Sequence, residues 1–409
     1  MNPLQFYEKI SKALPVTRSN QDFREDLKNS LSEYLESVKQ LEDNLFSDGE
    51  KAKTIAIIDG YNKQICAIVD MYYDGMHNIA FQEFASLLNG EILSNIGIHT
   101  ITTTRTRTLA NNSEPQIWFR ARVFQDKQIH SYKEMFHIPL NMRELVSTQR
   151  YSAPGYPCLY LGNTIYSCWE EMHRPRFDDV MFSGFKVVRD FNVYDLRIPK
   201  KSEFENAAWK NILFKMPLVI SCMIKVRNYD YPYKPEYIIP QLLVHTIISN
   251  NRNAMEYDKG PNDMPWGVIY TSTHVSQDFP YGVEYLENIA LPVIKNNDNT
   301  YCQVLASLFK ISDPICYEYE SLKENNARVF WQEVPAKYQE QTQKHYKESK
   351  MGYLEYRIIE KSTFHTLDHF YCNIPKSGVK IPQDGSSVSI QIITNLLDSK
   401  AKQTIDIQE

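Results

Sequence analysis

The sequence lacks most of the features that assign a protein to a compartment or a cofactor class. Its seven cysteines are odd in number and include no CxxC pair, which argues against a disulfide framework or a zinc site and favours reduced thiols. No run of about 18 apolar residues occurs, and the segment MNPLQFYEKISKALP lacks the apolar core of a signal peptide. No Gly-rich phosphate loop is present. We therefore expect a cytoplasmic protein without a membrane span or a metal.

Charge of one sign is not in excess either. The chain carries 45 Lys and Arg against 50 Asp and Glu, for a net charge of −5. This balance argues against a broad nucleic-acid-binding surface. The 43% hydrophobic and 23% charged residues are ordinary for a globular protein, and 27 tyrosines supply amphipathic side chains for sites and interfaces. A length of 409 residues predicts two or three domains.

The first part of the chain is predicted to be helical. Residues 20–46 show apolar positions in alternating steps of four and three, at Leu27, Leu31, Tyr34, Val38, Leu41 and Leu45. Further helices are expected over 53–73 and 77–88. The apolar seam could pack as a hairpin within the chain or between two chains in a homo-oligomer. We expect residues 1–112 to form a helical region with a role in oligomerisation or regulation.

Residues 113–313 are expected to form a separate domain rich in strands. From about residue 116, short β-like runs follow one another: IWFRARVF, PCLYLG, MFSGFKVV, MPLVISCMI, WGVIYTS and VLASLFKI. Helical patterns interrupt them at 164–172 and 235–249, without βαβ alternation, so we predict an α+β fold on a mostly antiparallel sheet. The extension 314–409 combines a charged helical stretch, 317–350, with a hairpin turning at Asp384-Gly385.

Several polar residues stand at strand or helix ends, where site residues gather. Arg120 lies in WFRARVF, where an inward-facing Arg calls for an anion, although a structural salt bridge is the ordinary alternative. Arg150-Tyr151 precedes a Pro-Gly turn. Tyr160 is followed by a short helix that ends in two glutamates, which point about 100° apart, so one of them can face a site. Ser272 ends the run GVIYTS.

These segments, taken in order, resemble the RES domain, a family of NAD-consuming enzymes that includes bacterial toxins. The residues that carry the resemblance are Arg120, Arg150, Tyr151, Tyr160, Glu171 and Ser272, with Gln241 and Asn288 as weaker matches. Gln149 stands where the family usually has Gly. The spacing from Tyr160 selects Glu171 over Glu170. The resemblance covers about 180 residues and implies a fold similar to ADP-ribosyltransferases.

The resemblance also implies roles for these residues. Glu171 would hold the ribose hydroxyls and stabilise the cation that forms when nicotinamide leaves. Arg120 and Arg150 would bind phosphates, and Tyr160 with Tyr151 would stack on a ring. Ser272 would bind the ribose, the amide or an attacking inorganic phosphate, while Gln241 and Asn288 would complete the NAD site. We expect an NAD phosphorylase or glycohydrolase with a toxin or antiviral role, partnered by an antitoxin or regulatory protein.

Other arrangements remain open on the sequence alone. The same site could transfer ADP-ribose to a protein or nucleic acid, or bind a nucleotide without catalysis. A hydrolase triad at Ser272 is not expected, because no Gly-X-Ser-X-Gly elbow surrounds the serine. His365 and His369 have the i, i+4 spacing of metal ligands but no evident third ligand, so we expect surface or packed histidines.

Overall fold

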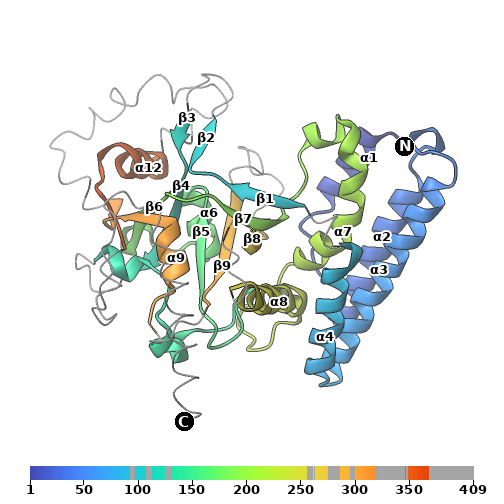
Figure 1. Cartoon of the computed structure of the whole chain (residues 1–409), viewed down its shortest axis with the longest axis horizontal. Coiled ribbons are helices and arrows are strands. Elements are labelled where there is room, and N and C mark those ends of the chain that lie inside the picture. Colours follow the sequence, from blue (N-terminus) through green and yellow to red (C-terminus); the bar gives the residue numbers. More distant parts are fainter. Residues whose placement is uncertain are drawn as a thin grey trace, which may run out of the picture.

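The computed structural model describes residues 1–92, 97–106, 113–124, 131–255, 261, 263–274, 286–294, 300–317, 320, 346 and 349–367. Within these ranges the fold is α+β, as predicted, with a group of helices at one end and a large sheet at the other (Figure 1). The predicted hairpin at Asp384-Gly385 and most of the predicted helix 317–350 lie outside the described residues.

The N-terminal region is helical, as the sequence predicts. Its helices are α1 (Pro3–Lys12), α2 (Phe23–Lys39), α3 (Glu50–Tyr73) and α4 (His77–Leu87). The helix expected over 20–46 is shorter. It begins after Asp22, whose side chain accepts the N–H of Arg24, and a separate 3-10 turn follows at Asp43–Leu45. An acidic cap satisfies an N–H that the helix itself leaves unbonded.

The apolar seam of α2 packs within the chain. Leu27, Leu31 and Val38 are buried, and α2 lies against α3 and α7 (Lys210–Cys222). The hydroxyl of Tyr34 donates a 2.8 Å hydrogen bond to the carbonyl of Leu213 in α7. The seam therefore packs as a hairpin within the chain, between α2 and α3, and α7 from later in the sequence adds a third helix.

Helix α7 corrects one sequence prediction. The run MPLVISCMI was expected to be a strand, but residues 210–222 form a helix that is buried on nearly every side and contains Pro217. A helix buried all round has no polar face, so its apolar pattern cannot be told from that of a buried strand. The run VLASLFKI is likewise part helix, α9 (Gln303–Leu308), and part strand.

Nine strands form the main sheet, in the order β1-β7-β8-β9-β5-β4-β6-β10-β11, and every described pairing except β7–β8 is antiparallel. Their bounds are β1 Ile98–Ile101, β4 Ile117–Val123, β5 Cys158–Gly162, β6 Val180–Val187, β7 Phe191–Leu196, β8 Pro265–Thr271, β9 Glu287–Pro292, β10 Phe309–Ser312 and β11 Phe364–His365. A separate ribbon pairs β2 (Thr104–Thr106) with β3 (Ser113–Pro115).

The sheet has two halves that meet at a narrow seam. Strands β4 and β5 share one registered pair, Phe119 with Gly162. By contrast, β4 pairs with β6 along its whole length, and β5 pairs with β9 from Cys158 to Gly162. Backbone hydrogen bonding between the halves is therefore minimal at the β4–β5 seam.

Helices cover the sheet differently on its two faces. On one face, α7 and α8 (Ile238–Met255) pack between the sheet and the N-terminal helices (Figure 1), and Val268, Tyr270 and Ala290 join their core. Helices α6 (Ile165–Glu171) and α12 (Lys350–Lys361) pack against β4, β5 and β6. The other face carries a second core around Trp118, Phe185 and Trp266, with residues of α9.

A segment before α2 fastens the N-terminal region to the rest of the chain. Val16 forms a parallel bridge with Ile224, accepting a hydrogen bond from Lys225 at 2.8 Å and donating one to Met223 at 3.0 Å. Arg18 forms ion pairs with Asp26 at 3.1 Å and with Glu236 at 2.7 Å. We call residues 16–18 the N-terminal strap.

Candidate functional site

Helix α6 places Glu171 beside the end of β8 and the start of β9, in the interior of the strand order. Thr164 caps the helix by accepting the N–H of Ser167 at 3.0 Å, and Ile165 and Cys168 bury the inner side. The helix lies very close to β5, because a Cβ at Gly162 would come within 2.2 Å of the Ser167 hydroxyl. Glycine at 162 therefore permits the approach that sets the position of Glu171.

The carboxylate of Glu171 is held asymmetrically. Its Oε1 accepts hydrogen bonds from Ser272 Oγ at 2.6 Å and from Asn288 Nδ2 at 2.9 Å. Its Oε2 lies 3.7 Å from His274 Nε2, and the side chain is 29% exposed. One oxygen is thus anchored by two donors, while the other faces an imidazole and solvent.

Strand register explains why these residues meet. Asn288 in β9 lies opposite Tyr270 in β8 and opposite Gly162 in β5, so its side chain shares their face of the sheet. Ser272 follows directly after β8. The Ser167 hydroxyl lies 3.0 Å from Asn288 Oδ1, which fixes the amide with its nitrogen toward Glu171.

The neighbouring Glu170 lies in a different environment. Its side chain is 3% exposed and pairs with Arg174 one turn later, with Oε1 2.7 Å from Nη2. Glu171 is therefore the glutamate that joins the serine and the asparagine, and Glu170 braces the end of α6.

Arg150 is close to this cluster, and three of its five N–H donors bind protein groups. Nη1 donates to the carbonyls of Cys222 and Ile224 at 2.9 and 3.0 Å, and Nη2 donates to Thr273 Oγ1 at 3.0 Å. Its guanidinium also lies over the ring of Tyr237. Arg150 thereby ties the end of α7 to the residue that follows Ser272.

Tyr151, in a buried turn, and Tyr160, in β5, support the site from the side of the core. Tyr151 is 1% exposed and packs against Tyr270 at 4.6 Å between ring centroids. Its backbone N–H donates to the Tyr160 hydroxyl at 3.2 Å. Burial raises the pKa of both phenols well above the usual value, so both stay neutral. A ring-stacking role is open to Tyr160, which is partly exposed, more than to Tyr151.

Gln241 acts on the same turn from α8. Its Nε2, which has two hydrogens to donate, lies within hydrogen-bonding distance of Thr148 Oγ1 at 3.1 Å, the carbonyl of Gln149 at 2.9 Å and that of Ser152 at 3.2 Å. These bonds pin the turn that carries Arg150 and Tyr151. Gln241 therefore contacts the backbone of the site, and the structure gives it no contact with Glu171.

Arg120 is not part of the Glu171 cluster. Phe119 and Asn288 are both opposite Gly162, so Arg120, one residue along β4, belongs to the other face of the sheet. Its Nη1 is buried without a hydrogen-bond partner. Burial, together with nearby Arg122, lowers the pKa of the guanidinium to about 9. A buried cation of this kind is expected to meet an anion.

Three residues beside Glu171 were not predicted as site residues, although His274 was considered for the hydrolase triad that the sequence argues against. His274 lies two residues after Ser272, and His173 lies two residues after Glu171. Tyr229 comes from the segment before α8, and its ring lies 4.4 Å from His173 and 5.3 Å from His274. The short spacing of the two histidines from the site residues was the available signal, whereas nothing in the sequence pointed to Tyr229.

The described part of the chain contains no group of three or more His, Cys, Asp or Glu side chains placed to hold a metal ion. His365 instead lies 3.0 Å from Asp313 and stacks on Tyr132, while His369 is outside the described residues. Among the described helices, none has the length and apolar character needed to cross a membrane.

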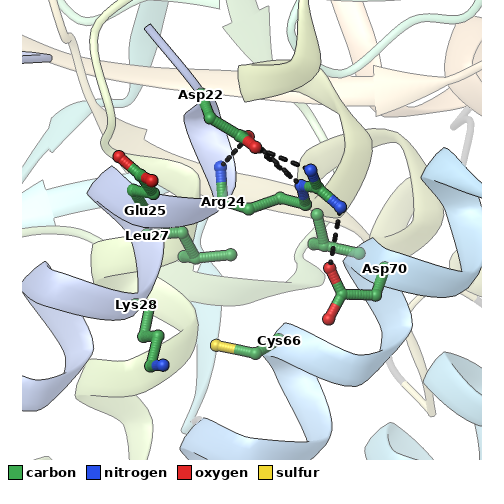
Figure 2. A pocket seen from close by; sticks show the side chains of 8 residues that line it. Asp22, Arg24, Glu25, Leu27, Lys28, Cys66 and Asp70 are labelled. Carbon is green, nitrogen blue, oxygen red and sulfur yellow. Dashed lines mark hydrogen bonds and ion pairs between the residues drawn. The ribbon is translucent and has the colours of Figure 1, made fainter. Parts of the chain in front are cut away.

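A surface hollow lies away from this cluster, between α2 and α3 (Figure 2). It is lined by Asp22, Arg24, Glu25, Leu27, Lys28, Cys66, Val69 and Asp70. Arg24 is paired with Asp22 at 2.6 Å and with Asp70 at 3.5 Å. These contacts brace the two helices, and we assign the hollow no ligand.

Comparison with known proteins gives one informative match. The chain is 27% identical over 366 residues to "Putative toxin YopC" of Bacillus subtilis (strain 168), covering 85% of this chain and 78% of that protein. A similarity of this length extends well beyond residues 113–313. No family model matches the sequence, and no solved structure matches it. The resemblance to the RES domain therefore stays a prediction from the residues.

Proposed function

We propose that this chain is an NAD-consuming enzyme that cleaves the bond between nicotinamide and ribose. The observation that carries the proposal is the asymmetric carboxylate of Glu171. Two donors fix Oε1 in place, and Oε2 stays open beside a solvent-accessible edge. A fixed carboxylate of this kind stabilises the positive charge that develops on the ribose as the bond breaks.

The reaction makes few demands on proton transfer. The carbon–nitrogen bond breaks with its electron pair going to the ring nitrogen, so the cationic nicotinamide ring departs neutral. An oxygen of water or inorganic phosphate then bonds to the same carbon, and the proton of water goes to solvent. Water yields ADP-ribose, and phosphate yields its 1″-phosphate. The residues around Glu171 supply electrostatics and positioning, which is what such a reaction needs.

Arg120 is the better of the two arginines for a phosphate. Arg150 spends both terminal nitrogens on carbonyls and Thr273, so we assign it to holding the Ser272 end of β8. Arg120 has a buried nitrogen with no partner. Because Arg120 lies on the other face of the sheet from Glu171, a dinucleotide that contacts both residues would have to pass between the faces at the β4–β5 seam, where a single registered pair joins the strands.

We further propose that the activity is toxic and is restrained by a partner. The relative in Bacillus subtilis (strain 168) carries a toxin name. Loss of NAD harms any cell, so a chain with this activity requires an antitoxin or a regulatory protein. Such a protein could act through the N-terminal helices. The strap joins these helices to Ile224, whose carbonyl accepts a hydrogen bond from Arg150 beside the site.

The test is chromatography of NAD incubated with the purified protein, with and without phosphate. Loss of NAD with release of nicotinamide supports the proposal, and dependence on phosphate separates phosphorolysis from hydrolysis. Labelled NAD that leaves its label on macromolecules in a lysate would favour an ADP-ribosyltransferase. Saturable NAD binding without nicotinamide release would favour a nucleotide-binding module.

A further inference from the structure

We infer that Tyr229, His173 and His274 form the subsite that holds the positively charged pyridinium ring of an oxidised dinucleotide against the open oxygen of Glu171. The inference rests on the proposed function and specifies it further, because it predicts that the site distinguishes a cationic ring from a neutral one.

The three rings form a connected group at the open side of Glu171. His173 and His274 meet edge to face at 4.8 Å between centroids, and Tyr229 contacts both. His274 Nε2 lies 3.7 Å from Glu171 Oε2. Tyr229 is 37% exposed, so part of its ring surface is free to receive a ligand.

The backbone that carries His173 is strained. His173 and Arg174 have φ values of 60° and 54°, in the left-handed region that residues with a Cβ rarely adopt. Such residues are unfavourable for a chain of L-amino acids, and strain of this kind gathers at functional sites. The bonds from His173 and Arg174 to the carbonyls of Glu170 and Trp169 maintain the turn. This turn changes the chain direction sharply after Glu171 and brings the ring of His173 against Tyr229.

The chemistry of the group suits a flat cation. A phenol ring attracts a cation placed over its face, and the Glu171 carboxylate attracts the same charge. The imidazoles suit this role only when neutral, and burial lowers the pKa of His274, which favours the neutral form. The charged or titratable groups near His274 are Glu171, His173, Arg150, Glu170 and Tyr229.

The experiment compares Tyr229→Leu with Tyr229→Phe, using NAD turnover and the binding of NAD and NADH. Phe keeps the ring, so its KM should stay within about twofold of the unchanged protein. Leu removes a contact of about 1–2 kcal/mol, which corresponds to a roughly 5- to 30-fold rise in KM. Binding of NADH, whose ring is neutral, should weaken much less. His245→Asn serves as a control, because His245 is also partly buried but lies on α8 against Tyr156.

The outcomes separate this inference from the proposed function. If the unchanged protein releases no nicotinamide, the proposed function fails before any variant is compared. If it does turn over NAD, and Tyr229→Leu weakens NAD and NADH equally or changes neither, the ring subsite is wrong while the enzyme stands. Melting temperatures of both variants show that each is folded.

Discussion

Ser272 Oγ donates a 2.6 Å hydrogen bond to Glu171 Oε1 across 101 positions of sequence. The bond joins the end of β8 to the end of α6, two elements that are far apart in the sequence and come together only when the chain folds. Because Asn288 donates to the same oxygen, Oε1 is held by two donors, and Oε2 is the oxygen that we propose contacts the substrate. The predictions below follow from this asymmetry and from the charges around it.

Glu171→Gln should lower NAD turnover strongly, while Glu170→Gln should retain it. Removing the carboxylate that we propose to face the ribose is expected to lower kcat by about 10²–10³, with little change in melting temperature. Glu170→Gln instead loses the ion pair with Arg174 and should cost about 1–3 kcal/mol of folding free energy. Steady-state kinetics and thermal unfolding of both variants check this. The reverse pattern would mean that Glu170 carries the chemistry.

Ser272→Ala and Asn288→Ala should each reduce kcat about tenfold by loosening the anchored oxygen. Because both donors hold the same atom, the double variant should lose less than the product of the single effects. A double-mutant cycle on kcat measures this coupling. Strictly multiplicative losses would show that the two residues act on different groups.

Arg120→Met should weaken catalysis and strengthen the fold. The buried guanidinium has an unpartnered nitrogen, so an apolar side chain of similar length should raise stability by about 1–2 kcal/mol. Loss of the phosphate contact should raise KM for NAD. Denaturant unfolding and kinetics provide the two measurements. A destabilised variant with unchanged KM would assign Arg120 a purely structural role.

The KM for NAD should rise as the pH falls below about 6.5, the ordinary histidine value. Burial lowers the pKa of His274, so the imidazole takes up a proton only on the acid side of that value, and its charge then repels a cationic ring. His274→Asn should flatten this acid limb, whereas His245→Asn should leave it unchanged. A limb that survives in His274→Asn would assign the titration to another group.

Folding stability should also fall with acid, through a different histidine. His137 accepts the N–H of Cys302 at Nε2, at 2.9 Å, and Nδ1 lies 2.8 Å from the carbonyl of Ile138, so the neutral ring satisfies both neighbours. Burial lowers its pKa to about 3. The stabilisation is complete above pH 6.5, where the unfolded ring is also neutral. Below that value the unfolded chain binds the proton first, and stability falls by about 1.4 kcal/mol per pH unit.

The check is denaturant unfolding between pH 4 and pH 7.5. In His137→Gln, the slope of the unfolding free energy against pH should decrease by the contribution of one histidine. Burial also lowers the pKa of His99, to about 4, so part of the slope should remain in that variant. An identical slope in the unchanged protein and the variant would show that His137 is not the group responsible.

Local patterns predicted much of the fold. The α+β class is confirmed, and so are the helices near 53–73 and 77–88 and the strand that carries Arg120. The error at residues 216–224 arose because α7 is buried between the N-terminal helices and the sheet, which removes the polar face that marks a helix. Burial from several sides is a tertiary property, so no local window contains it.

The site was predictable in part. Glu171, Ser272 and Asn288 were singled out from the sequence, and the structure brings them into hydrogen-bond contact. The placement of Arg120 on the other face of the sheet from the Glu171 cluster depends on strand register. Register is set by pairings between segments far apart in the sequence. Tyr229 reaches the site only because its segment folds back beside His173 and His274.

The N-terminal strap makes the chain suitable for division into two cooperating fragments. The backbone of Val16 forms hydrogen bonds with Met223 and Lys225, on either side of its bridge partner Ile224. The carbonyl of Ile224 in turn accepts a hydrogen bond from Arg150. A fragment lacking the first 112 residues would lose these bonds and the apolar cover of α7. Residues 1–112 and 113–409, produced separately, should regain turnover only after mixing, which would make NAD loss a reporter of fragment complementation.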